Sequence, residues 1–236
     1  MSEWKLRAFW SDVTVESVET GFAPRLKGRL VKTPAKASLV LPTAEAAELV
    51  AKEWRAQEGE VDPTTMFHTR MANAAIDKVA IQIDEVVNLL ADYGATDLIC
   101  YRATHPAALV ERQKAGWDPL IAWVDETYDV QLDVFEGVMF QAQGEEDLAR
   151  LEAEIRKFTP FELAAFHDLV TLTGSLVLGI AAAKKAFDID VIWSLSRIDD
   201  QYQIDEWGRD EEAEESAAKK HDEFRSAYVF FNAVQI

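Results

Sequence analysis

The sequence has little of what disulfide bonding, phosphate binding or the common hydrolytic chemistries require. Cys100 is the only cysteine among 236 residues, so no disulfide can form within the chain, as is typical of reducing compartments. The 10 glycines are scattered, and neither a GxxxxGK(S/T) loop nor a GxGxxG turn is present. A GxSxG elbow is absent as well. The commonest signatures of nucleotide-binding proteins and hydrolases are therefore missing.

Basic residues are also scarce. The chain carries 24 lysines and arginines against 42 acidic residues, which gives a net charge of −18. Because such a chain repels phosphate backbones and anionic lipids, we expect no nucleic acid partner. The most apolar stretch, Leu169–Ala183, is too short and too polar to span a bilayer, and Met1–Trp10 lacks the apolar core of a signal peptide. We expect no membrane insertion, and a location in the cytoplasm or its equivalent, the mitochondrial matrix.

Metal ligands at suitable spacings are lacking too. None of the four histidines is paired with another at i, i+4, and there is no HExxH motif. The acidic positions of residues 198–215 do not match the spacing of an EF-hand loop. We therefore expect no cofactor, no metal and no catalytic residues, so that the protein binds a partner and is not an enzyme.

The residues that are present predict two kinds of structure in succession. The hydrophobic content of 49% is enough for a substantial core. Short runs of apolar and β-branched residues up to Pro42 predict a small antiparallel sheet with a tight turn at Lys27-Gly28. The expected strands are Phe9–Val18, Phe22–Leu26, Arg29–Thr33 and Ser38–Leu41.

Helical patterns follow from Thr43 onward. Thr43 is expected to cap a helix over Ala44–Gln57, and Asp62-Pro63 marks a second helix start, with a broken or continuous helix to about Tyr93. Thr159-Pro160-Phe161-Glu162 is a capping box that opens a further helix to about Ala186. Other helices are expected over 106–114, 118–128, from Asp188, and over 210–232; the segment 130–143 fits either short strands or an extended connection.

Together these patterns predict an α+β protein. We expect a β-rich N-terminal lobe with one helix over residues 1–62 and an α-helical domain over residues 63–236. The boundary is placed where glycine, proline and charges cluster, between Gly59 and Pro63.

The acidic segment Ile198–Glu215 is the most informative part of the sequence for function. It mixes nine carboxylates with Tyr202 and Trp207, and aromatic residues in a charged surround are typical of protein interfaces. The rings can equally pack their helix onto the core. Gly208 is expected to end one helix, and the acids after it suit the first turn of the next. The remaining charge can bind a basic partner surface, or, as an alternative, Asp199-Asp200 can form an acid pair for hydrolysis.

A series of short motifs follows in order along most of the chain: Gly21-Phe22, 26–29, 32–34, 41–43, 51–57, 63–66, 73–77, 96–102, 113–119, 173–175, 200–203 and 207–213. Together these motifs resemble a known family, the assembly chaperones that handle the alpha subunit of the ATP synthase catalytic head. The chain departs from the family pattern at Met66-Phe67, where a Met-Pro pair is frequent, and at Asp199 or Asp200, where Glu is frequent.

The resemblance implies a β-rich N-terminal lobe, a helical C-terminal domain and a function. The protein is expected to bind newly made alpha subunit and to shield its beta-facing surface, without hydrolysing nucleotide, and to be a monomer when free. The family role carries over to Asp199 and Asp200 as partner-binding residues, and to Trp207 and Glu211 beside them. A scaffold with another basic target is a further alternative.

Other residues of the shared motifs are expected to be structural. They are read as core and cap positions, and Asp97 with Arg102 as a buried ion pair. The residues in this group are Trp54, Asp97, Tyr101, Arg102, Trp117 and Asp118.

Overall fold

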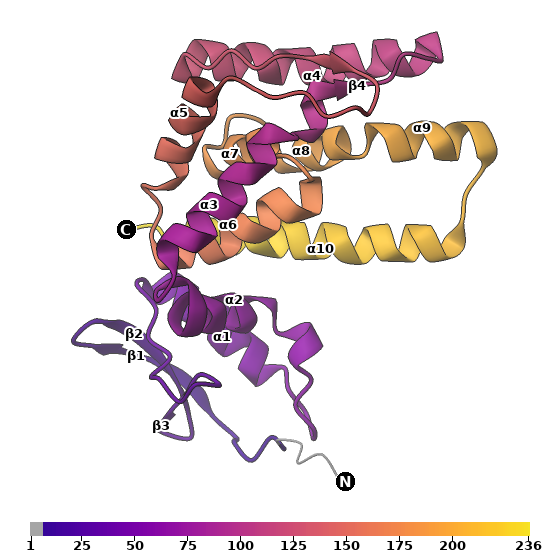
Figure 1. Ribbon diagram of the computed structural model, residues 1–236. Helices are drawn as coiled ribbons and strands as arrows, with labels where there is room; N and C mark the ends of the chain where they lie inside the picture. The colour runs from indigo at the N-terminus through magenta and orange to yellow at the C-terminus, as the bar shows by residue number, and fades with distance from the viewer. Residues whose placement is uncertain (1–6) are drawn as a thin grey trace, which may run out of the picture. The chain divides into compact units, whose positions relative to one another are not determined.

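The computed structural model describes residues 7–236, which form two compact units (Figure 1). Unit 1 comprises the residues up to Ile83 together with Thr159–Ala165 and Val229–Ile236. Unit 2 comprises Asp84–Phe158 and Phe166–Tyr228. A three-stranded sheet followed by many helices confirms the predicted α+β class. The predicted domain boundary at residue 62 stays a prediction.

The sheet of unit 1 is the antiparallel meander that the sequence predicts. Strands β1 (Val13–Val18), β2 (Gly21–Leu26) and β3 (Arg29–Leu30) lie in the order β1-β2-β3. Lys27 and Gly28 both have positive φ, 49° and 76°, as a two-residue turn with the twist of its strands requires. The run from Ser38 to Leu41 adds isolated bridges, to Lys32 and Phe22, in place of a fourth strand.

Helix α1 (Ala44–Arg55) packs on this sheet in unit 1. Its start is the predicted one, because the Thr43 hydroxyl accepts a hydrogen bond from the amide of Ala46 at 3.1 Å. Trp54 lies in the core, as expected. After it come the 3-10 turn Pro63–Thr65, α2 (Phe67–Ala74) and the π-helical turn Ala75–Val79, so the predicted helix to Tyr93 is a broken one.

Unit 2 is built almost entirely of helices. The short strands β4 and β5 pair in parallel within it, Tyr101 opposite Phe135 and Arg102 opposite Glu136. The elements after the π-helical turn are α3 (Ile83–Ala95), the 3-10 turn Leu98–Cys100, β4 (Tyr101–Arg102), α4 (Ala107–Tyr128), β5 (Phe135–Glu136), α5 (Glu145–Ile155), α6 (Pro160–Thr173), α7 (Leu176–Ala183), α8 (Ile189–Ser196), α9 (Ile198–Trp207) and α10 (Glu211–Ala233).

Two helix boundaries differ from the prediction. The expected break at Asp118-Pro119 is wrong, because α4 runs through Pro119; the buried side chains of Trp117 and Leu120 on either side hold the helix in place despite the missing amide donor. The single helix expected from Pro160 to Ala186 is also wrong. It ends at Gly174, whose φ is +70°, and α7 begins behind a new cap at Ser175.

The expected ion pair between Asp97 and Arg102 is a further correction. Arg102 donates from Nη1 to Asp118 Oδ1 at 2.9 Å and from Nε to the carbonyl of Ile99 at 2.7 Å. Asp97 accepts from the backbone amides of Ile99 and Val177, at 3.2 and 3.0 Å. The second of these partners lies at the start of α7, a non-local contact that sequence spacing does not show.

Candidate functional site

The acidic segment folds as α9, a break at Gly208, and the start of α10. Tyr202 is buried, so its ring packs α9 onto unit 2, whereas Trp207 is 80% exposed. Gly208 ends α9 as predicted, but with φ 92° and ψ 176° its backbone is extended and not left-handed helical. Of the two aromatic residues of the segment, Tyr202 therefore belongs to the core and only Trp207 leaves its ring accessible.

Two carboxylates of α9 are neutralised by arginines of unit 2. Asp200 Oδ2 lies 2.9 Å from Arg197 Nη1, and Asp205 Oδ2 lies 2.6 Å from Arg112 Nη1. The hydrogen bonds from Arg112, and then from Gln201, hold the pKa of Asp205 below its ordinary value. Arg112 also lies over the Tyr202 ring at 5.1 Å. The pair with Arg112 braces α9 on α4, the pair with Arg197 lies within the start of α9, and together they leave less free charge than the sequence implies.

Asp199 differs from these two residues. Its Oδ1 accepts a hydrogen bond of 2.7 Å from Nε2 of the buried Gln113, whose Oε1 accepts in turn from the amide of Ala103 at 2.8 Å. In the part of the chain that the structure describes, no cation lies within ion-pair distance of Asp199. The carboxylate is half-buried, is positioned by a neutral amide, and has no ion-pair partner among the described residues.

Asp199 lies at a groove of about 620 Å³ in unit 2. The groove runs along β4, the start of α4 and the loop after β5. Its walls are mixed, with apolar side chains toward the loop and polar ones toward α9. The lining includes Leu98, Tyr101, Arg102, His105, Leu109, Gln113, Val138, Phe140, Asp199 and Gln203.

The four predicted partner-binding residues do not form one cluster. Asp199 and Asp200 lie in the first turn of α9, and Trp207 is its last residue. At 1.5 Å per residue, the axial separation between Asp199 and Trp207 is about 12 Å. Glu211 is the first residue of α10 and is exposed. Of the four residues, only Asp199 lines the groove. The predicted partner-binding residues therefore lie along an extended surface and do not form a compact site.

The acid-pair alternative finds no support in this geometry. Consecutive residues of a helix point about 100° apart, and Asp200 is committed to Arg197. Within residues 7–236, no group of three or more His, Cys, Asp or Glu side chains is placed to hold a metal ion. Nor is any helix in that range long and apolar enough to cross a membrane.

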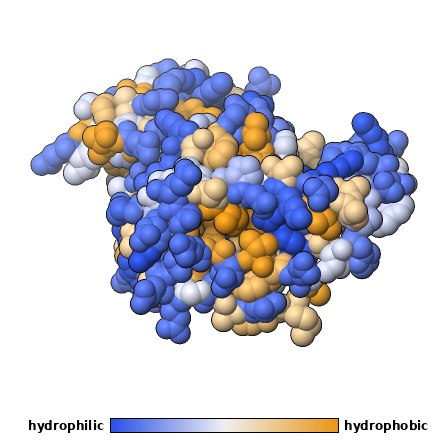
Figure 2. Space-filling model, turned by 90° about the horizontal axis from the view of Figure 1, so that it is seen from above, coloured by the Kyte–Doolittle hydropathy of each residue, from blue (hydrophilic) through white to orange (hydrophobic). Residues whose placement is uncertain are grey.

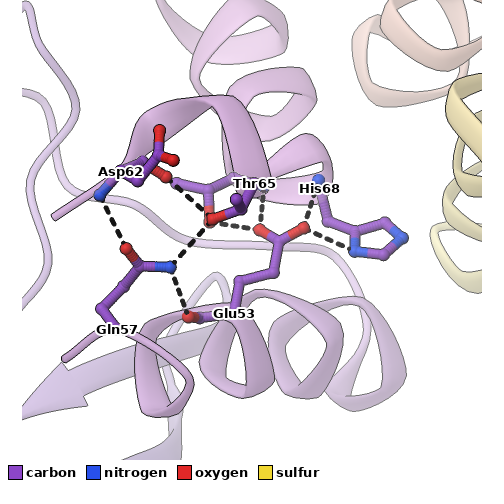
Figure 3. Close-up of polar contacts among 6 residues, drawn as sticks. Glu53, Gln57, Asp62, Thr65 and His68 are labelled. Carbon is purple, nitrogen blue, oxygen red and sulfur yellow. Dashed lines mark hydrogen bonds and ion pairs between the residues drawn. The ribbon is translucent and has the colours of Figure 1, made fainter. Parts of the chain in front are cut away.

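In unit 1 a carboxylate and a histidine are in contact at the N-terminus of α2, where the carboxylate accepts hydrogen bonds from the first amides of the helix (Figure 3). Glu53 Oε1 accepts from the amide of His68 at 2.7 Å and lies 2.8 Å from its Nδ1, while Oε2 accepts from the amide and hydroxyl of Thr69. Burial acts to raise the pKa of Glu53, but the hydrogen bonds from His68 and Thr69 outweigh it and lower that pKa. Glu53 thus caps α2 from α1, as a structural residue.

The loop after β5 is the feature of the groove that the sequence did not indicate. Val138, Met139 and Phe140 are 92%, 77% and 66% exposed. From sequence, the segment 130–143 fits short strands or an extended connection. Gly137, with φ +82°, was the available signal of a turn that projects them outward.

Comparison with known proteins identifies the class. A family model described as ATP12 chaperone protein matches residues 7–125. The structure of Atp12 from Paracoccus denitrificans is 45% identical, covers 99% of this chain and 100% of that one, and superposes with a TM-score of 0.93. An aspartate-to-lysine mutant of the same protein gives 44% identity, the same coverages and the same score. The mitochondrial protein atp12 of Schizosaccharomyces pombe is 25% identical over 221 residues, 89% of this chain and 76% of that protein.

The chain therefore belongs to the ATP12 chaperone family. That membership confirms the family resemblance of its motifs and makes the protein a chaperone of ATP synthase assembly.

Proposed function

We propose that the protein binds the unassembled alpha subunit of ATP synthase and shields the surface that later contacts the beta subunit. Asp199 supports this proposal most directly. It is a half-buried carboxylate that is held in place by Gln113 and has no cation of its own among the described residues. A positioned, uncompensated negative charge beside a groove suits recognition of a cationic side chain on another protein.

The proposed binding surface includes Asp200, Trp207 and Glu211 around Asp199. Trp207 offers a large ring with most of its area accessible, the kind of residue that anchors interfaces. Subunits awaiting assembly expose apolar interfaces that aggregate, and a chaperone that covers such a surface needs no catalytic step. In this proposal the protein acts without a cofactor, in the cytoplasm or the mitochondrial matrix.

The test is binding of isolated alpha subunit, with light scattering to follow its aggregation. Wild-type protein is expected to form a complex and to keep the alpha subunit soluble. The double variant Asp199→Lys/Asp200→Lys should weaken binding at least tenfold, because two attractive contacts become repulsive. Trp207→Ala and Glu211→Lys should weaken it less.

The matched control is Asp92→Lys/Asp222→Lys, which makes the same change of net charge at exposed acids on α3 and α10. It should bind as wild type does. If wild-type protein neither binds alpha subunit nor suppresses its aggregation, the proposal is wrong. If the Asp199/Asp200 variant loses its thermal stability, these residues are structural and the proposed site is wrong.

A further inference from the structure

Unit 2 exposes apolar side chains in one short segment. Four of the eleven exposed large hydrophobic residues in the described chain fall within residues 134–140: Val134, Val138, Met139 and Phe140. The other seven are spread from Phe9 to Ile236. Single exposed apolar residues are ordinary, but a cluster on one loop marks an interaction site.

Two grooves border this segment. Between α4 and residues 130–136 lies a groove of about 640 Å³, with Ile121, Leu132 and Val134 among its apolar lining. The groove beside Asp199, of about 620 Å³, lies along residues 137–140. Both are lined by Arg102 of β4 and by Ala103 after it, so they form one surface across the β4–β5 pair. Figure 2, seen from above, the side of α4, shows hydrophobic side chains in a hollow with hydrophilic ones around it.

Polar groups on this surface suit a polypeptide. Arg102 lines both grooves, is 6% exposed, and its Nη2 has no hydrogen-bond partner among residues 7–236. At the α9 end of the surface, Asp199 offers its uncompensated charge to a cation. The other groove carries Asp125 and Glu136 beside two ion pairs, Arg102 with Asp118 and Lys114 with Glu111.

We infer that the loop 137–140 and the two grooves bind one segment of the client subunit that carries apolar side chains and a lysine or arginine. The apolar side chains occupy the grooves against Val138 and Phe140, and the cation reaches Asp199. This inference rests on the proposed function, since it takes the alpha subunit as the client. It adds the chemistry of the segment that is recognised and the loop that recognises it.

The first experiment compares two double variants for binding to isolated alpha subunit. Val138→Ser/Phe140→Ser removes apolar area from the loop, and Leu89→Ser/Val191→Ser removes it from exposed positions on α3 and α8, which are 53% and 47% exposed. All four side chains point into solvent, so both variants should fold. We expect the loop variant to bind at least tenfold more weakly and the control to stay within twofold of wild type.

A second experiment reads the chemistry of the bound segment. Cys100 is buried, so Met139→Cys introduces the accessible thiol to which a photo-crosslinker can be attached. Irradiation with bound alpha subunit should label one segment with apolar residues and at least one lysine or arginine. The same label on Leu89→Cys should give no specific crosslink.

The outcomes separate the two proposals. If wild-type protein binds alpha subunit and the loop variant binds equally well, or both double variants lose affinity alike, the inference is wrong and the proposed function stands. A crosslinked segment without a basic residue also overturns it. If sedimentation shows that wild-type protein self-associates and the loop variant does not, the occupant is a second copy of this chain and the inference fails. If wild-type protein does not bind alpha subunit, both proposals fail.

Discussion

At the scale of single residues, Asp97 shows how a buried carboxylate is used in place of a salt bridge. It is fully buried, and its two oxygens accept from different places: Oδ1 from the amide of Ile99 and Oδ2 from the amide of Val177. Both amides belong to starts of helical turns, whose N–H groups lack partners within the turn. Asp97 thereby ties the 3-10 turn before β4 to α7.

Asp97→Asn should destabilise the protein although it removes a buried charge. The amide has one acceptor oxygen, so its NH2 group would face an N–H donor that the carboxylate now satisfies. Leaving one such buried donor without a partner costs about 1–3 kcal/mol. The free energy of unfolding in urea measures the change. A variant more stable than wild type at pH 7 would show that the cost of burying the charge dominates.

The pH dependence of this difference follows from the pKa of Asp97. Burial raises that pKa from 3.8 to about 6. Between these values the folded state binds more protons at Asp97 than the unfolded state does, so its contribution to stability is full below about 3.8 and is lost as pH rises through about 6. Wild type should therefore gain about 1 kcal/mol over Asp97→Asn between pH 7 and pH 5. A gap that does not change with pH would contradict the raised pKa.

At the scale of elements, capping motifs could be predicted, whereas the continuation of α4 and the end of α6 could not. The capping box of α6 is confirmed, since the Thr159 amide donates to Glu162 and the Glu162 amide to Thr159. Such signals are local in sequence. By contrast, Pro119 lies inside α4 and Gly174 ends α6, because packing across unit 2 decides where those helices continue. The candidate site divides in the same way: the acidity of α9 and its i, i+3 pair with Arg197 are local in sequence, but the ion pair from Asp205 to Arg112 of α4 is not.

Gly174→Ala tests the break between α6 and α7. Gly174 has φ +70°, and a Cβ there would meet no atom within 4 Å, so the cost is backbone strain alone. We expect a loss of about 1 kcal/mol of unfolding free energy. Gly174→Asn is the matched control, since asparagine adopts positive φ more readily, and should lose less. Equal stability of wild type and Gly174→Ala would mean that the break does not need glycine.

At the scale of the whole molecule, charge and apolar contact should control different steps of binding. The net charge of −18 acts over a distance set by salt, whereas the loop side chains act only in contact. A chaperone must later release its client. If charge sets the association rate and apolar contacts set the dissociation rate, association can be fast without dissociation being slow.

Rapid-mixing kinetics with alpha subunit can show this division. For wild type, the association rate should fall about tenfold or more from low salt to 0.5 M salt while the dissociation rate changes little, because screening removes steering and leaves contacts intact. Asp199→Lys/Asp200→Lys should weaken that salt dependence. Val138→Ser/Phe140→Ser should keep the salt dependence and raise the dissociation rate, since buried apolar contacts hold the complex together after encounter. If the loop variant changes association and the charge variant changes dissociation, the roles assigned to α9 and to the loop after β5 are reversed, and recognition begins at the apolar surface.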